Sequence, residues 1–164
     1  MLTQKDVVNI PKAHKVIVDA DACPVKPEIV KAAAPFGVGV LMVASYDHRL
    51  APMDGVEIVQ VDRSDQSVDL YIVNRIAAGD VLVTQDFGLA ALALGKKAIA
   101  LSNRGQQYTD LTIDFLLDRR HEQAKQRRGG KHTKGPRPFT EEDRHFFLQS
   151  LTKVLKGLQE ISES

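Results

Sequence analysis

The sequence is poor in the residues that most often reveal a protein's class. It has one cysteine among 164 residues, no tryptophan and only 5% aromatic residues. A single cysteine excludes a disulfide framework and a zinc site built from several cysteines, and it suits a reducing compartment. The longest apolar run, residues 36–44, is far shorter than the roughly 20 residues of a membrane span. Residues 1–15 contain no apolar stretch of signal-peptide length. We therefore expect a cytoplasmic protein that does not contact a membrane.

Charge is nearly balanced over the whole chain but unevenly distributed. The formal net charge is +1, yet residues 118–138 carry +6 and the remainder carries −5. A basic segment on an acidic body is compatible with nucleic-acid binding or with a solvated surface helix, and the asymmetry alone leaves both open. If the segment binds nucleic acid, the residues expected to contact phosphates are Arg119, Arg120, Arg127, Arg128 and Lys131.

Short β-branched runs alternate with helical stripes over about one hundred residues. The expected strands lie at 16–18, 38–43, 56–61, 81–84 and 98–101, with helices between them. This alternation predicts an α/β protein: a three-layer α/β/α sandwich with a mostly parallel sheet of about five strands, followed by C-terminal helices. We assign residues 15–164 to a single domain and residues 1–14 to an N-terminal extension. The domain includes a Gly- and Pro-rich basic loop at 129–138, expected to be mobile, and a helix at 140–161.

Aspartates follow several of the expected strands, at the edge where ligands gather in parallel sheets. Asp19 and Asp21 follow the first strand, and an extended backbone would aim both side chains the same way. Several carboxylates at one edge repel one another unless a cation offsets them, and hard oxygen ligands suit Mg²⁺ or Mn²⁺. The competing interpretation is that Asp86 and Asp110 only cap the helices that follow them. The candidate catalytic acids are Asp19, Asp21, Asp69, Asp86 and Asp110, with Asp114 as the alternative to Asp110.

Two other side chains lie near the same predicted edge. Arg104 follows the fifth strand, where it would bind a substrate phosphate or would remain a solvated loop arginine. Cys23 stands at a helix N-terminus, but no histidine lies near it in the sequence to act as a base. We therefore interpret Cys23 as a small packing residue beside the site rather than as a nucleophile.

Residues 18–24, Val-Asp-Ala-Asp-Ala-Cys-Pro, resemble the opening signature of the bacterial YaiI/YqxD family. Three further stretches resemble the same family, in the same order along the chain. They are 79–86, then 103–105 with Tyr108 and Asp110, and finally 135–136 with 143–144 and Phe146. The resemblance runs from about residue 15 to the C-terminal helix.

That family in turn resembles PIN-like nucleases, which have a compact α/β/α fold and cleave RNA or DNA. These enzymes use Mg²⁺ or Mn²⁺ held by three or four carboxylates. The resemblance implies that Asp19, Asp69 and Asp86 hold the metal and that Asp110 supplies the fourth acid. Asn103 occupies the loop directly after the fifth strand, and Asp21 has no counterpart in PIN-like proteins.

The leading hypothesis is a metal-dependent nuclease that acts on RNA more readily than on DNA, with the basic segment holding the backbone without reading sequence. An apolar run followed by Asp-x-Asp also resembles the first motif of haloacid-dehalogenase-type phosphatases, with Asp19 as nucleophile and Asp21 as acid. This chain has only one acid in 84–86 and lacks their lysine motif. A third hypothesis is a non-catalytic module on the same fold that binds nucleic acid or a protein partner.

Overall fold

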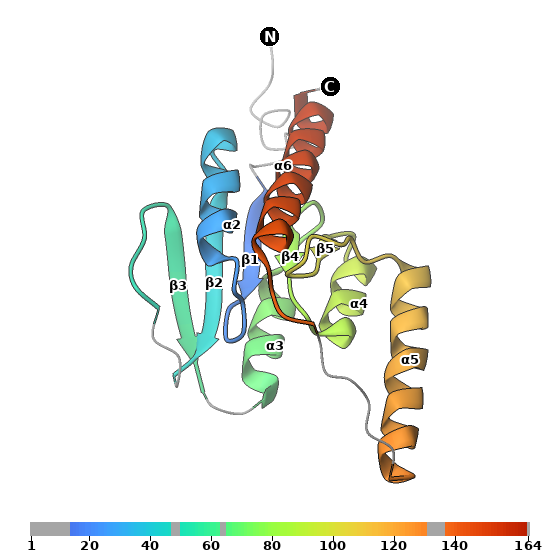
Figure 1. The fold of residues 1–164 in the computed structure, drawn as a ribbon. Helices are drawn as coiled ribbons and strands as arrows, with labels where there is room; N and C mark the ends of the chain where they lie inside the picture. The colour runs from blue at the N-terminus through green and yellow to red at the C-terminus, as the bar shows by residue number, and fades with distance from the viewer. Residues whose placement is uncertain (1–13, 47–49, 63–64, 131–136, 164) are drawn as a thin grey trace.

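Figure 1 shows a computed structural model of the chain, which describes residues 14–46, 50–62, 65–130 and 137–163. Most of the expected N-terminal extension, and residues 131–136 of the expected mobile loop with Lys131, lie outside the described residues.

A five-stranded, all-parallel sheet forms the centre of the molecule. Its strands are β1 (Lys15–Asp19), β2 (Gly39–Ser45), β3 (Val56–Val61), β4 (Val81–Val83) and β5 (Ile99–Leu101). Their order across the sheet is β3-β2-β1-β4-β5, so β1 is central. The β-branched and leucine-rich runs form strands because parallel strands are covered on both faces and need apolar side chains in both directions. The predicted strands are confirmed, with boundaries that move by one or two residues.

Helices cover both faces of the sheet (Figure 1). The helices are α2 (Lys26–Ala33), α3 (Asp65–Arg75), α4 (Phe87–Gly95), α5 (Asp110–Arg128) and α6 (Glu141–Glu163), with a short 3₁₀ turn at Ala34–Phe36. Val16 and Val18 pack in one core with α2 and α6, whereas Ile17 packs in the other core with α3 and α4. This alternation along β1 gives the two cores of a three-layer α/β/α sandwich, which confirms the predicted fold class.

Side chains cap the starts of α4, α5 and α6, and only at α5 does the cap differ from the one that the sequence suggested. Asp86 caps α4, accepting hydrogen bonds from the backbone N–H of Gly88 and Leu89. At the start of α6, Thr140 and Asp143 bond reciprocally, the side chain of each accepting the backbone N–H of the other. At α5, however, the cap is Thr109, paired with Thr112, and Asp110 is the first helical residue rather than the cap. The threonine pair satisfies the first backbone groups of α5, so the cap needs no carboxylate.

No helix in the described part of the chain combines the length and the hydropathy of a membrane-spanning segment.

Candidate functional site

The carboxyl ends of β1 and β4 mark the point where the chain changes direction across the sheet. From β1 the chain proceeds outward through β2 to β3, and it then returns to form β4 and β5 on the other side. In open α/β sheets, ligands bind at such a switch point. Asp19 is the last residue of β1 and Asp86 directly precedes α4, so both carboxylates stand at this point.

The hydroxyl of Thr84 connects these two aspartates. It donates to Asp19 Oδ2 over 2.9 Å and accepts the backbone N–H of Asp86 over 3.0 Å. Thr84 is almost completely buried. The Thr84 hydroxyl has a single proton. Its oxygen accepts a hydrogen bond from the Asp86 amide, and its proton is donated to Asp19. Thr84 therefore fixes how Asp19 is presented, a role that the sequence shows only as a Thr-x-Asp spacing.

Asp69, from α3, reaches the same place. Burial raises the pKa of Asp69 to about 6, with further contributions from the charges of Asp86 and Asp19 and from a hydrogen bond to Asp86. Burial also raises the pKa of Asp19, against the lowering effect of its bond to Thr84, and the charges of Asp21 and Asp86 add to the increase. Such charge effects on Asp19 and Asp69 require close approach, so Asp19, Asp69 and Asp86 form one group, called here the acidic cluster.

Asp21 lies near this cluster but does not point the way the sequence predicted. The chain turns at residues 21–22 instead of staying extended. Asp21 Oδ1 accepts the backbone N–H of Ser45, at the end of β2, whereas Asp19 bonds to Thr84 on the β4 side. The prediction that both side chains aim the same way is therefore wrong: the two carboxylates bond to opposite neighbours of β1. The charge of Asp21 still raises the pKa of Asp19.

Asp110 and Asp114 are exposed on the first turns of α5. The charges that raise the pKa values of Asp19 and Asp69 come from Asp19, Asp21 and Asp86. A role for Asp110 or Asp114 as a fourth acid stays a prediction. Cys23 is buried, and burial raises the pKa of its thiol to about 11, which keeps it protonated and agrees with a packing role.

Asn103 occupies the loop after β5, where the PIN-like resemblance led us to look for an acid. Its backbone N–H donates to Gln85 Oε1 and its side-chain Nδ2 donates to the carbonyl of Ala22. Its side-chain oxygen is buried without a hydrogen-bond partner among the described residues. Rotating the amide would set oxygen against the Ala22 carbonyl, so the atom left without a partner is the oxygen. A buried acceptor in this state is uncommon, and it adds a neutral oxygen to the edge that carries the acidic cluster.

The donor chemistry of this edge fits a hard divalent cation. The charge of Asp86 adds to the raised pKa values of Asp19 and Asp69, and the buried side-chain oxygen of Asn103 has no hydrogen-bond partner in the described part of the chain. Oxygen ligands of this kind suit Mg²⁺ or Mn²⁺. Within the described ranges, however, no three acidic, histidine or cysteine side chains are arranged as a ready set of metal ligands. One oxygen of Asp86 caps α4 and one of Asp19 bonds to Thr84.

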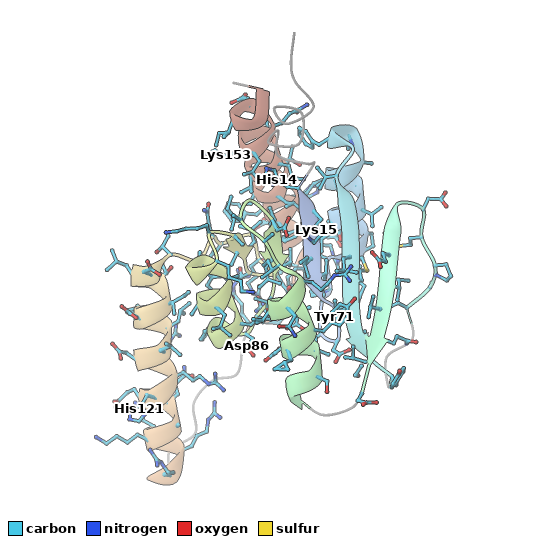
Figure 2. All side chains as sticks on the ribbon, turned by 180° about the vertical axis from the view of Figure 1, so that it is seen from behind. His14, Lys15, Tyr71, Asp86, His121 and Lys153 are labelled. Carbon is cyan, nitrogen blue, oxygen red and sulfur yellow. The ribbon has the colours of Figure 1, made fainter. Side chains whose placement is uncertain are left out.

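The C-terminal half of α5 carries positive side chains on the same side of the molecule as the acidic cluster. The C-terminal half of this helix, which carries Arg119, Arg120, Arg127 and Arg128, extends past the carboxyl edge of the sheet (Figure 1). In Figure 2, Asp86 and His121 of α5 both lie toward the same lower end of the molecule. The predicted basic surface and the predicted acidic site are therefore on the same side of the protein.

The guanidinium of Arg104 is already bonded within the protein. It donates to Asp143 Oδ2 over 2.6 Å and to the carbonyl of Arg137 over 2.5 Å, and it lies 5.2 Å from the centre of the Phe139 ring. Arg137 also binds Asp143, and this contact, with the Thr140 backbone N–H, holds the pKa of Asp143 well below its usual range. Arg104 thus fastens the start of α6 to the loop after β5. Phosphate binding by Arg104 stays a prediction that competes with these contacts.

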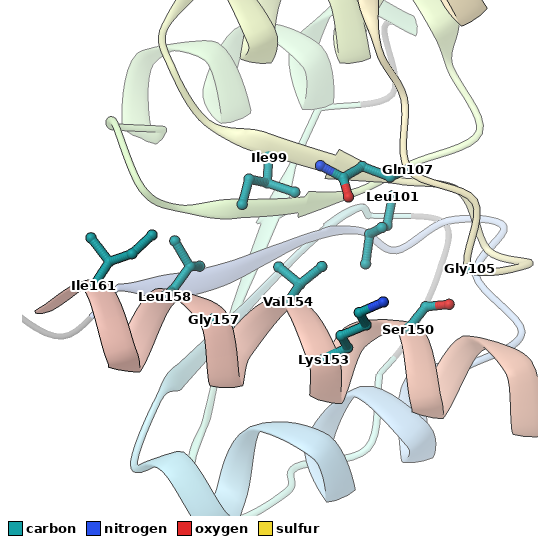
Figure 3. Close-up of a pocket in the computed structure, with 10 residues that line it drawn as sticks. All are labelled: Ile99, Leu101, Gly105, Gln107, Ser150, Lys153, Val154, Gly157, Leu158 and Ile161. Carbon is teal, nitrogen blue, oxygen red and sulfur yellow. The ribbon is translucent and has the colours of Figure 1, made fainter.

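A separate groove of about 410 Å³ lies between β5 and α6 (Figure 3). Most of its lining is apolar, including Leu101, Val154 and Leu158, and Lys153 is its one charged residue. Since its lining contains no acid and Asn103 is not part of it, the groove does not share the chemistry of the acidic cluster.

Residues 17–157 match the model of the family described as "Uncharacterized BCR, YaiI/YqxD family". The chain belongs to the YaiI/YqxD family. It is 46% identical over 152 residues to a UPF0178 protein of Bacillus velezensis, covering 92% of this chain and 90% of that protein. It is 47% identical to a UPF0178 protein of Halalkalibacterium halodurans, covering 87% of this chain and 91% of the relative. A UPF0178 protein of Listeria monocytogenes serotype 4b is 41% identical, with 87% and 98% covered. No solved structure is significantly similar to this chain. Membership of the YaiI/YqxD family confirms the resemblance found in the sequence and assigns no activity.

Proposed function

We propose that this chain hydrolyses phosphodiester bonds in nucleic acid, RNA in preference to DNA, with a Mg²⁺ or Mn²⁺ ion held by Asp19, Asp69 and Asp86. The observation that carries the proposal is the acidic cluster at the switch point: burial and the charge of Asp86 raise the pKa values of Asp19 and Asp69, and the charge of Asp19 adds to the increase for Asp69. When bound, the cation supplies Lewis-acid stabilisation of charge on a phosphoryl oxygen.

The chain's own residues have separate tasks in this proposal. Thr84 keeps the carboxylate of Asp19 oriented, and the cap that Asp86 makes at α4 fixes the position of its carboxylate. Arg119 and Arg120 are exposed on the half of α5 that passes the carboxyl edge, where they would bind phosphates of the substrate backbone. These contacts hold a nucleic acid irrespective of its base sequence.

A binding module without catalysis is the second candidate, and one observation favours it. The acidic cluster is not arranged as a ready ligand set in the described residues, and the loop directly after β5 carries Asn103 in place of an acid. A protein of this kind would bind nucleic acid through α5 and leave it intact.

The test compares Asp19→Asn with a matched control, Asp54→Asn. Asp54 is exposed in the turn before β3, at the opposite edge of the sheet. A labelled single-stranded RNA and the DNA of the same sequence are incubated with the full chain in Mn²⁺, and Mn²⁺ binding is measured separately by calorimetry. We expect cleavage that needs Mn²⁺, a loss of about 100-fold or more with Asp19→Asn, and no loss with Asp54→Asn. Asp19→Asn should also weaken Mn²⁺ binding.

Other results would point elsewhere. Binding of RNA that persists in a chelator, with no cleavage of either nucleic acid in Mn²⁺, would overturn the nuclease proposal and support the binding module. A covalent phosphate on Asp19, formed from a phosphomonoester, would instead support the phosphatase hypothesis.

A further inference from the structure

Helix α5 has little contact with the rest of the molecule for its length. It has 19 residues, and Ile113 is its only buried residue. Leu111 and Phe115 are 82% and 64% exposed. In Figure 1 the helix begins beside α4 and then continues beyond it, clear of the sheet. Helices in proteins gain most of their stability from packing an apolar face, so a helix this exposed leaves a surface for a partner.

One face of α5 carries an ordered row of charges. Its members recur at spacings of four, four, three, four and three residues, which keeps them on a single stripe of a helix with about 3.6 residues per turn. The first half of the stripe is acidic and the second half is basic. All six residues are exposed: Asp110, Asp114, Asp118, His121, Lys125 and Arg128. This set is called here the charged stripe.

Within one copy of the chain, each half of the charged stripe repels itself. Asp110, Asp114 and Asp118 are four residues apart, and Lys125 and Arg128 are three apart, spacings at which like charges destabilise a helix. No lysine or arginine occurs between residues 110 and 118. The helix dipole favours acids at the start of α5 and bases at its end, but it does not remove the repulsion between neighbouring like charges, which opposite charge from outside would relieve.

An antiparallel second copy supplies that charge in register. With a twofold axis between residues 119 and 120, Asp110 lies opposite Arg128 and Asp114 opposite Lys125. Asp118 then lies opposite His121, whose ring donates a hydrogen bond. In a twofold interface each of these pairs occurs twice. The antiparallel helix dipoles add to the attraction.

We propose that the charged stripe of α5 is a docking surface for a second copy of this chain. The exposed side chains of Leu111 and Leu117 border the stripe and would pack on the aliphatic stems of the basic residues opposite. A nucleic acid is a poor occupant of the whole stripe, because the three aspartates repel phosphates. In the dimer, Arg128, which the sequence predicts to contact phosphate, pairs with Asp110 of the second copy instead. Arg119 and Arg120 point to another side of the helix, at about 100° per residue, and stay available for substrate in the dimer.

The test is a charge exchange, read by sedimentation equilibrium of the full chain. One variant carries Asp110→Lys and Asp114→Lys, and the other carries Lys125→Glu and Arg128→Glu. Wild type should dimerise, and more weakly as NaCl rises from about 50 to 500 mM. Each variant alone should show a dissociation constant at least about tenfold higher, because attractive pairs become repulsive. Their equimolar mixture should form a heterodimer, because a basic stripe then meets an acidic one.

Recovery in the mixture also distinguishes docking from misfolding, since two damaged helices would not restore each other. Circular dichroism of each variant provides a second check that α5 is intact. The proposal is overturned if wild type is monomeric at every concentration, or if dimerisation is unchanged in both variants. It is also overturned if the mixture behaves as the sum of its components.

Discussion

At the scale of single residues, the acidic cluster combines like charges without a neighbouring cation. Burial is the largest cause of the raised pKa values of Asp19 and Asp69, and the side chains that add to it or oppose it are other carboxylates and the Thr84 hydroxyl. Structural carboxylates in proteins are usually paired with a base, as Asp143 is with Arg104 and Arg137. A cluster that lacks such pairing lowers the stability of the folded chain, and proteins retain such groups mainly at functional sites.

Removing one charge from the cluster should therefore stabilise the metal-free protein. Asp69→Asn, measured in a chelator, should melt at a higher temperature than wild type at pH 8. The pKa of Asp69 is raised to about 6, so wild type gains stability as the pH falls through 6 and has the full gain below about 4. The advantage of Asp69→Asn should shrink over that range.

Adding Mn²⁺ provides the converse measurement at the same site. It should raise the melting temperature of wild type and of Asp54→Asn, and raise that of Asp69→Asn much less. A variant that is no more stable than wild type at pH 8, or that responds to Mn²⁺ as wild type does, would contradict the acidic cluster as a cation site.

At the scale of elements, the placement of α6 depends on the loop after β5. Gly105 has a φ of +86°, and a Cβ built there would lie 2.9 Å from Phe147 Cα and 2.9 Å from Ser150 Oγ. Helix α6 thus packs directly on this glycine. Asp143 at the first turn of α6 binds Arg104 from the same loop, and Arg144 donates to the carbonyl of Pro24. These contacts hold α6 against the loops that follow β1 and β5.

Two glycine substitutions distinguish the contact of Gly105 with α6 from the general effect of replacing glycine by alanine. Gly105→Ala should lower the free energy of unfolding by about 2–4 kcal/mol, because alanine disfavours positive φ and its methyl group meets the α6 backbone. Gly157→Ala, in open space on α6, should raise it by about 0.5–1 kcal/mol. Urea denaturation measures both. Equal stability of the two variants would show that α6 does not rest on Gly105.

The sequence predicts helices and strands better than it predicts the tertiary contacts between them. Strands were predictable because β-branched runs buried on both faces leave a clear pattern, and the cap at Asp86 because its spacing is local. The cluster of Asp19, Asp69 and Asp86 was predictable from parallel topology together with the PIN-like resemblance. The bonding of Arg104 to Asp143 was not, because it joins residues 39 positions apart through tertiary packing. The N-cap of α5 is Thr109 and not Asp110, and the sequence does not choose between them because threonine and aspartate both serve as N-cap residues.

At the scale of the whole molecule, the two ends differ in chemistry. The carboxyl edge of the sheet carries the acidic cluster, the C-terminal half of α5 extends past that edge, and Figure 2 shows Lys153 of α6 toward the opposite end from Asp86. Under the proposed function, a nucleic acid held by α5 extends to the acidic cluster, whereas one held near Lys153, at the opposite end, does not. This division lets binding and cleavage be separated by mutation.

The corresponding experiment measures binding alone, in an Asp19→Asn background that prevents cleavage. That substitution should leave RNA affinity equal or slightly higher, because it removes a negative charge near the phosphates. Adding Arg119→Ala with Arg120→Ala should weaken binding at every sequence tested. The slope of log affinity against log salt should become shallower by up to about 1.4, because each phosphate contact on a single strand contributes about 0.7.

The matched control, Lys153→Ala with Lys156→Ala, removes the same charge from exposed residues of α6 and should leave the slope unchanged. Equal slopes for the two double variants would mean that α5 attracts RNA only through net charge and that it does not hold the backbone beside the acidic cluster.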